Sequence, residues 1–421
     1  MQKSKNLSIL FLLLYFLASC NNRKSTEFLG NDFPKTISLD LSEATAYPLK
    51  LSDIAEKIEY IPLQTVDNAL LGSLSCIVVT KDNFFIQTDD SSMVYRYDKE
   101  GRFLNRMFKV GRGPGETIPL SFTVDDTRKQ LYVLTSREEL YVYDYNGNFI
   151  KKIDKLKVDP VDYTISLGFF NNTLFYAQMP DPKIKYIHYC QDLNNDSIIF
   201  HYKNPNDYGK FNENISPKMF SLSDYNYQIT DSSVLFKERF CDTIFGLDKS
   251  FIAEPRYIIE LGNQKLKWED YRDIFVFHEG PITPQFKFPN GYWIASHTET
   301  ELFIFFVIRS HNDPQLFCIY NKNTGLIKIS KRRYYDNIDN QVYIENDLDR
   351  IVAFPPMNKR GRITYYDECL YYNIEAIDFV NDYKSASDEI KNSSDYLKKM
   401  APILSSITDF SNTIIMKVYL K

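Results

Sequence analysis

The sequence predicts an all-β protein, a six-bladed β-propeller of four-stranded blades with a short C-terminal helix and a closing strand. Three observations lead to this prediction. The 421 residues include 31 Tyr, 31 Phe and 2 Trp, and aromatic side chains favour pleated, half-buried surfaces. Apolar runs of strand length alternate with short polar turns, and these turns recur at intervals typical of propeller blades.

The clearest copies of the repeated unit are two strands that each end in a D-x-x-G turn. Met93–Tyr97 leads into Asp98–Gly101, and Leu140–Tyr143 leads into Asp144–Gly147. An Asp side chain accepts hydrogen bonds from the amides of such a turn, and Gly tolerates a positive φ. The pattern therefore has a physical cause beyond composition.

Weaker copies extend the repeat along the chain. Turns fall near residues 98, 144, 192, 248, 321 and 373, which are 46 to 73 residues apart. Two stacked β-sandwich domains would also repeat strands, but six recurrences of a similar unit favour a propeller. The longest interval contains Leu266–His278, which we expect to form an inserted helical loop.

The N-terminus has the features of an export signal. Lys3 and Lys5 precede the apolar run Leu7–Leu17, which is shorter than the roughly 20 residues of a membrane-spanning helix. The following Leu17–Cys20 resembles the bacterial lipobox. The resemblance implies that residues 1–19 are removed and that Cys20 becomes the lipid attachment site; a plain signal peptide with an incidental cysteine is the alternative.

The residues after Cys20 bear on localisation. Residues 20–35 are polar and are expected to form a lipidated N-terminus and flexible tether. Asn21, instead of Asp, favours the outer membrane by the usual lipoprotein sorting rule. Arg23 and Lys24 without an acidic run favour a periplasm-facing protein, although exposure at the cell surface stays open.

The C-terminal residues depart from the repeat. Ser385 or Ser387 can cap a helix that runs to about Met400 and ends at Pro402. The strand 413–420 is expected to close the ring in a blade that it shares with Thr36–Leu41. The predicted organisation is a signal peptide (1–19), a tether (20–35), a six-bladed propeller (36–384) and a C-terminal helix with the ring-closing strand (385–421).

Three segments together resemble a known family. Ile58–Leu63, Gly111–Glu116 and Cys241–Phe245 are similar to segments of the six-bladed β-propeller lipoproteins of Gram-negative bacteria, distant relatives of TolB-like propellers. Phe245 stands where that family has Tyr. The resemblance implies a propeller fold and an envelope location, and it supplies no catalytic residues.

The glycine-rich Gly111–Glu116 is the main candidate for ligand binding. It lacks the Lys-Ser/Thr of a phosphate-binding loop, and Pro114 removes an amide donor. A tight turn is the simpler interpretation. The functional hypothesis is that Arg112, Gly113 and Glu116 contact a ligand at the mouth of the central channel.

Other patterns give weaker hypotheses. His297, Glu299 and Glu301, at a spacing of two, could share one strand face. Asp192–Asp196 resembles the start of an EF-hand loop but lacks its glycine and final glutamate. The basic clusters 331–333 and 359–362 are expected to be solvated, or to contact acidic headgroups or glycans. We therefore predict no catalytic residue, no metal site and no cofactor.

Charge and motifs together favour a binding protein over an enzyme. The formal net charge of −5 argues against nucleic acid as a partner. The expected partners are the membrane, through the lipid, and an unidentified envelope protein or glycan. The leading hypothesis is a non-catalytic binding or scaffold module; the alternative is a metal-dependent hydrolase or lyase acting on glycans or lactones.

Overall fold

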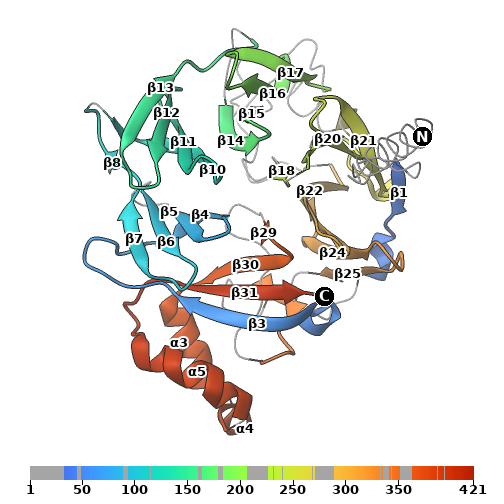
Figure 1. Ribbon diagram of the computed structural model, residues 1–421. Helices are drawn as coiled ribbons and strands as arrows, with labels where there is room; N and C mark the ends of the chain where they lie inside the picture. Colours follow the sequence, from blue (N-terminus) through green and yellow to red (C-terminus); the bar gives the residue numbers. More distant parts are fainter. Residues whose placement is uncertain are drawn as a thin grey trace, which may run out of the picture.

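In the computed structural model, six sheets of four or five strands surround a common axis, which confirms the predicted six-bladed β-propeller (Figure 1). Each blade has four antiparallel strands, the first nearest the axis and the fourth at the rim. The structure describes residues 33–421 except 45–48, 89–92, 114, 160–163, 179–183, 206–225, 231, 239, 268, 271–288, 332, 335–340, 343, 351–362, 386 and 393.

The blades follow one another in chain order. They are β4 (Leu74–Val79), β5 (Asn83–Thr88), β6 (Val94–Asp98) and β7 (Phe103–Arg106); β10 (Pro119–Asp125), β11 (Gln130–Thr135), β12 (Leu140–Asp144) and β13 (Phe149–Ile153); β14 (Thr164–Phe170), β15 (Thr173–Gln178), β16 (Tyr186–Asp192) and β17 (Ser197–Lys203); β18 (Asn226–Ile229), β19 (Val234–Lys237), β20 (Thr243–Leu247) and β21 (Ala253–Glu260); β22 (Tyr292–Glu299), β23 (Phe303–Ser310), β24 (Leu316–Asn321) and β25 (Ile327–Lys331); and β29 (Thr364–Tyr366), β30 (Cys369–Ile374), β31 (Ile414–Leu420) and β3 (Ala55–Pro62).

The sixth blade closes the ring by combining both ends of the chain. β31 is its third strand and pairs antiparallel with β3, from Lys57↔Tyr419 to Pro62↔Ile414. The predicted sharing of this blade is therefore confirmed, but the expected segment Thr36–Leu41 was wrong. Part of that segment, in β1 (Lys35–Ser38), instead adds a parallel fifth strand to the fourth blade.

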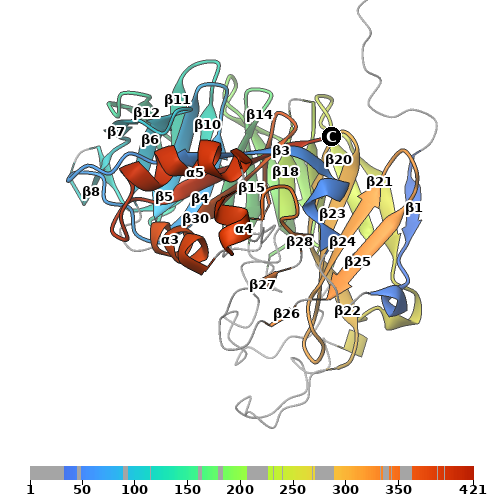
Figure 2. The same cartoon turned by 90° about the horizontal axis from the view of Figure 1, so that it is seen from below.

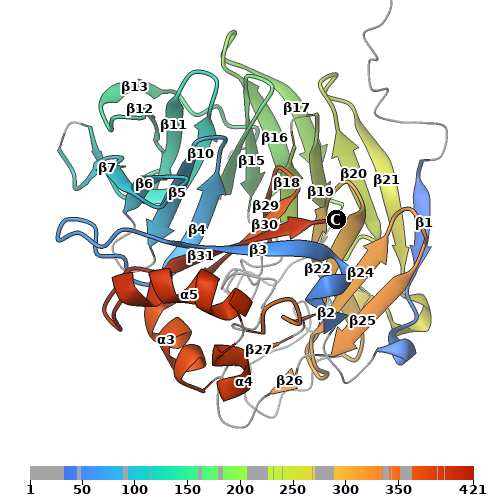
Figure 3. The same cartoon turned by 60° about the horizontal axis from the view of Figure 1, so that its bottom comes forward.

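The segment that includes β1, β2 and β3 follows the outside of three blades, and we call residues 33–62 the N-terminal belt (Figure 3). β1 lies on the rim of the fourth blade and leads into η1 (Leu41–Glu43). Near the fifth blade, β2 (Leu49–Lys50) pairs with β28 (Ile344–Glu345). η2 (Leu51–Asp53) then leads into β3 of the sixth blade.

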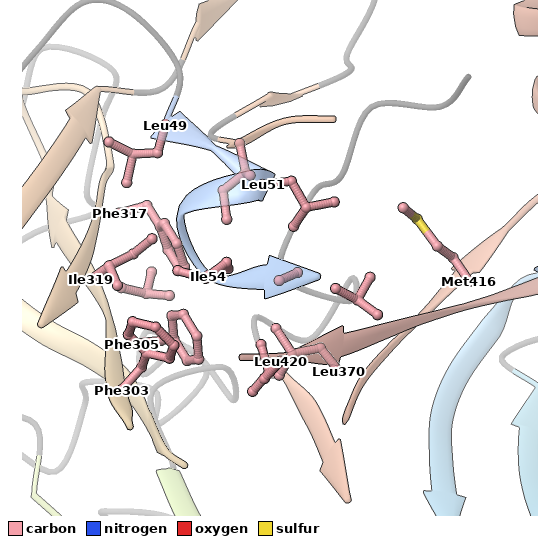
Figure 4. Close-up of a cluster of buried hydrophobic side chains, with 14 of the residues drawn as sticks. Leu49, Leu51, Ile54, Phe303, Phe305, Phe317, Ile319, Leu370, Met416 and Leu420 are labelled. Atoms are coloured by element: carbon pink, nitrogen blue, oxygen red, sulfur yellow. The ribbon is translucent and has the colours of Figure 1, made fainter. Parts of the chain in front are cut away.

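The belt is held by burial and by polar contacts. Leu49, Leu51 and Ile54 point toward Phe317 and Ile319 of the fifth blade (Figure 4). Polar bonds reinforce this packing, because Asp53 pairs with Lys328 at 2.7 Å and the hydroxyl of Ser52 donates to Asp347 at 2.6 Å. The N-terminal residues therefore seal the junction between the fifth and sixth blades.

Helices occupy the connection between β30 and β31 (Figure 1). They are α3 (Ala376–Ser385), α4 (Asp388–Lys391) and α5 (Ser394–Ser406). The predicted C-terminal helix before the closing strand is confirmed, but its expected bounds were wrong, because the helical region begins earlier, at Ala376, is divided into three helices, and includes Pro402 inside α5. The observed positions of α3 and α5 bury Phe379, Met400 and Ile403 in the core beside the sixth blade, and this burial stabilises them. No helix in the described ranges is long and apolar enough to cross a membrane.

Most of Leu266–His278 lies outside the described residues, so the expected helical insertion stays a prediction.

The two ends of the ring differ. Because strands alternate in direction, the turns from first to second and from third to fourth strand share one end, which we call the turn end. The connections between blades and the helices occupy the other, which we call the loop end. Figure 2 shows α3, α4, β26 (Arg333–Tyr334) and β27 (Gln341–Val342) toward the loop end, with the C-terminus toward the turn end.

The D-x-x-G turns have a role in packing between blades. Gly101 and Gly147 have φ of 81° and 85°. A Cβ on Gly101 would lie 2.3 Å from the Pro62 oxygen, and one on Gly147 would lie 2.6 Å from the Arg106 oxygen. Pro62 and Arg106 end the outer strands of the preceding blades. The glycines are thus required both by φ and by close packing on the neighbouring blade.

Gly147→Ala is expected to lower the free energy of unfolding by about 3 kcal/mol, because strain at positive φ and overpacking against the Arg106 carbonyl add together. Gly325→Ala is the matched control, since Gly325 has φ 71° and a Cβ added to it would meet nothing within 4 Å. It should lose about 1 kcal/mol. Urea denaturation of both variants checks this, and equal losses would contradict the packing role.

Leu51→Ala is expected to cost about 3 kcal/mol of unfolding free energy, because Leu51 is fully buried between two blades and truncation leaves a cavity. Leu326→Ala, at a side chain that is 56% exposed, should change it by less than about 0.5 kcal/mol. Thermal and urea unfolding of the two variants would measure the difference. A loss at Leu51 no larger than at Leu326 would show that the belt adds little stability.

Candidate functional site

The candidate ligand residues Arg112, Gly113 and Glu116 lie in a loop that is braced by its own hydrogen bonds. β8 (Lys109–Val110) and β9 (Glu116–Thr117) pair in parallel on either side of it. The Glu116 carboxylate accepts from the Gly113 amide at 2.9 Å, and the Glu116 amide donates to the Gly113 oxygen at 3.0 Å. The loop is therefore a tight turn; Pro114 lies outside the described residues.

This turn lies at the rim and not at the channel. A Cβ on Gly115 would lie 3.1 Å from the Phe149 Cβ in the outer strand β13, and Figure 1 places β8 at the outer edge. The expectation that Arg112 and Glu116 sit at the channel mouth was therefore wrong. The reason is that the connection between the first and second blades starts at the outer strand β7 and ends at the inner strand β10. The glycine segment lies in the part of this connection that is still at the rim. Ligand binding by these residues stays a prediction.

The spacing of His297 and Glu299 does place both on one face of β22, where basic side chains of the protein bind the Glu299 carboxylate. The Glu299 carboxylate is bound by Arg256 through two nitrogens at 2.9 Å and by Lys322 at 3.0 Å. Glu301 is exposed. Among the residues that the structure describes, no group of three His, Cys, Asp or Glu side chains could hold a metal ion.

Glu299 instead joins the fourth and fifth blades near the turn end. Burial acts to raise its pKa, but hydrogen bonds from Arg256 and Tyr257 and the charge of Lys322 hold the pKa below its usual value. The Glu299 backbone also exchanges two hydrogen bonds with the Gln228 side chain, at 2.7 and 2.6 Å. The carboxylate thus joins β22 to the outer strand β21 of the fourth blade, and the Glu299 backbone joins β22 to the inner strand β18.

A second set of charged groups was not found from the sequence. His188, Lys237, Glu238 and His297 come from the third, fourth and fifth blades and are only 2 to 5% exposed. His188 Nε2 lies 3.1 Å from Glu238 Oε1, and the Lys237 ammonium donates to the Glu238 backbone oxygen at 2.5 Å. We call these four residues the buried charged cluster.

Lys237 ends the second strand of its blade and His188 is near the start of the third strand of its own, whereas His297 lies two residues before Glu299 in β22. Aromatic rings surround the cluster: the His188 ring stacks on Phe175 with centroids 5.2 Å apart and meets Phe236 at 5.0 Å. The only sequence signal was Lys-Glu directly after an apolar strand, which is common in solvated turns.

Burial and the nearby Lys237 charge lower the pKa of His297 to about 3. His297 is therefore neutral in the folded protein down to low pH. In the unfolded chain an imidazole takes up a proton below about pH 6.5. The unfolded state thus binds more protons between these values, so stability falls as the pH drops from 6.5 toward 3.

The wild-type protein should lose about 2 kcal/mol of unfolding free energy from His297 between pH 7.5 and pH 5. His297→Gln is expected to remove this part of the pH dependence, whatever its effect at pH 7.5. His201→Gln, at an exposed histidine, should leave the slope unchanged. Urea unfolding at the two pH values measures this change in unfolding free energy. A change in His297→Gln equal to that of wild type would contradict the assignment of the pH dependence to His297.

Some predicted features lie outside the described residues. Cys20 and the rest of the export signal are among them, as is the basic cluster 359–362. Lipid attachment at Cys20 therefore stays a prediction. Asp192, by contrast, forms a polar turn: its carboxylate accepts from the Asn194 amide and the Asn195 side chain, both at 2.9 Å.

The fold is similar to that of several solved structures. A protein of Bacteroides fragilis NCTC 9343 described as exported aligns with a TM-score of 0.62 and 17% identity, covering 92% of this chain and 100% of its own. That identity shows the fold alone. Two further structures are more distant. BamB of Moraxella catarrhalis aligns with a TM-score of 0.35 and 11% identity, covering 75% of this chain and 72% of its own. The extracellular domain described for a one-component system of B. thetaiotaomicron aligns with a TM-score of 0.35 and 13% identity, covering 68% of this chain and 30% of its own.

No curated protein matches the sequence. The narrower resemblance to lipoprotein relatives of TolB-like propellers has no named relative to support it and stays a prediction. One family, described as a domain of unknown function (DUF4934), matches residues 34–419. This range includes all six blades and almost all of the N-terminal belt and of the closing strand, and so the chain belongs to the DUF4934 family.

Proposed function

We propose that the protein is a lipid-anchored, non-catalytic binding or scaffold module of the outer membrane, whose loop end binds a partner in the cell envelope. The observation that carries this proposal is the direction in which the chain enters the propeller. This direction supports an orientation in which the loop end faces away from a membrane that holds a lipid on Cys20.

The direction follows from the register of β1. β21 runs from the turn end at Ala253 to the loop end at Glu260, and β1 runs parallel to it from Lys35↔Tyr257 to Ser38↔Glu260. The chain therefore enters from the turn-end side of the fourth blade. Phe33 is fixed there, with its ring 5.6 Å from that of Tyr257.

Because the chain enters the propeller from the turn-end side, a lipid on Cys20 would hold the turn end nearer the membrane than the loop end. The intervening residues would reach roughly 20 Å as a flexible coil, less than the width of a propeller. A turn end that lies nearer the membrane leaves the loop end facing away from it. Binding sites are commonly built on the segments that connect the strands of a rigid scaffold, and the loop end carries α3, α4 and the turn that precedes β31.

The proposal is tested in two steps in the native envelope. Cys20→Ala should abolish labelling by an alkyne-tagged fatty acid and release the protein from the membrane fraction. A photo-crosslinking amino acid at Ile377 in α3, which is 50% exposed, should then give a protein adduct. The same residue at Ile252, which is 61% exposed at the turn end, should not.

Labelling that persists in Cys20→Ala would contradict the lipid anchor. Adducts at Ile252 equal to those at Ile377, or none at either position, would contradict binding at the loop end.

A further inference from the structure

Two exposed apolar side chains project from neighbouring turns at the loop end. Phe410 is 91% exposed, more than any other large apolar side chain that the structure describes, and Leu70 is 60% exposed. Leu70 lies in the connection from β3 to β4, and Phe410 lies between α5 and β31. Both connections belong to the loop end.

Asn412 joins the two turns. It is 2% exposed, and its side chain accepts from the Leu71 amide at 2.8 Å and donates to the Ala69 oxygen at 2.7 Å. The backbone amide of Asn412 donates to the Thr65 hydroxyl at 2.8 Å. The backbone on both sides of Leu70 is therefore fastened to a residue two positions after Phe410.

The turn that carries Phe410 is also closed. The Ser411 hydroxyl accepts from the Thr408 amide at 2.8 Å, the Ser411 amide donates to the Thr408 oxygen at 3.0 Å, and the Phe410 amide donates to the Thr408 hydroxyl at 3.3 Å. An aromatic side chain on a fixed backbone loses little freedom on binding. Rigid exposed aromatic residues are typical anchors of protein interfaces.

The charges around these side chains favour a protein partner over a lipid surface. Asp67 and Asp409 are exposed beside Leu70 and Phe410. Arg106, which is also nearby, donates through Nε to the Asn68 oxygen at 2.6 Å. The two carboxylates are repelled by an anionic lipid leaflet, whereas a protein pocket bordered by Lys or Arg complements them.

We propose that Leu70 and Phe410 form a docking knob that inserts into an apolar pocket, bordered by basic residues, of a partner protein in the envelope. This inference rests on the proposed function, because it names the contact point at the loop end. Burial of the Phe410 ring supplies the affinity, and Asp67 and Asp409 add specificity and a dependence on salt.

The experiment uses the full-length protein in its native envelope, with a photo-crosslinking amino acid at position 410 or at position 326. Leu326 is the control, since it is 56% exposed at the turn end. Position 410 should give one discrete protein adduct and position 326 none. The adduct is identified by mass spectrometry, and the partner is purified for direct binding measurements.

With the purified partner, Phe410→Ala and Leu70→Ala should each raise the Kd at least tenfold, while Leu326→Ala changes it less than twofold. Asp409→Lys should also weaken binding, more at low salt than at high salt. All four positions are exposed, so unchanged unfolding midpoints would show that the variants remain folded.

The inference is overturned by adducts to lipid or to a second copy of the chain, by equal adducts from both positions, or by no adduct at position 410. It is also overturned if Phe410→Ala leaves the Kd unchanged. An adduct from Ile377 without one from position 410 would leave the proposed function standing and remove only the docking knob.

Discussion

The antiparallel pairing of β3 with β31 joins residues 55–62 to residues 414–420, and the rest of the ring depends on it. Without this pairing the sixth blade has no outer strand and the sheet edge of β31 is open. The N-terminal belt extends the closure, because it also adds a strand to the fourth blade and buries Leu49 and Leu51 beside the fifth. Half of the blades therefore depend on residues from the first part of the chain.

Polar and charged side chains also join individual neighbouring blades to each other. Glu299 with Arg256 joins the fourth and fifth blades, and Arg96 joins the first and second by donating to the Tyr145 oxygen at 2.9 Å. At the junction of the sixth and first blades, the Lys99 ammonium lies 4.6 Å from the Phe84 ring centroid and 5.0 Å from that of Tyr371. Arg and Lys side chains near aromatic rings are thus a common device of this ring, which agrees with its high aromatic content.

The sequence predicted what is local and repetitive. The turns at Asp98 and Asp144, the blade number and the closing strand follow from alternation and turn chemistry, and the structure confirms them. The strand that joins β31, the extent of the C-terminal helices and the rim position of Arg112 depend on contacts between residues far apart in the chain. The buried charged cluster was missed for the same reason, since His188, Lys237 and His297 meet only after three blades have assembled. Likewise, nothing in the sequence around Phe410 indicates that Asn412 fastens this turn to Leu70.

The parallel register of β1 has a mechanical consequence for a protein held by its N-terminus. A pull on the chain before β1 would act along the axis of this strand, so the pairs from Lys35↔Tyr257 to Ser38↔Glu260 would bear the load together in shear. They do not open one after another, as they would in a hairpin pulled from its end. Ile37 and Leu39, both buried, would also have to slide out of the core at the same moment. Tension applied at the N-terminal end would therefore be taken up at the rim of the fourth blade, two blades away from β3 and the closure of the ring.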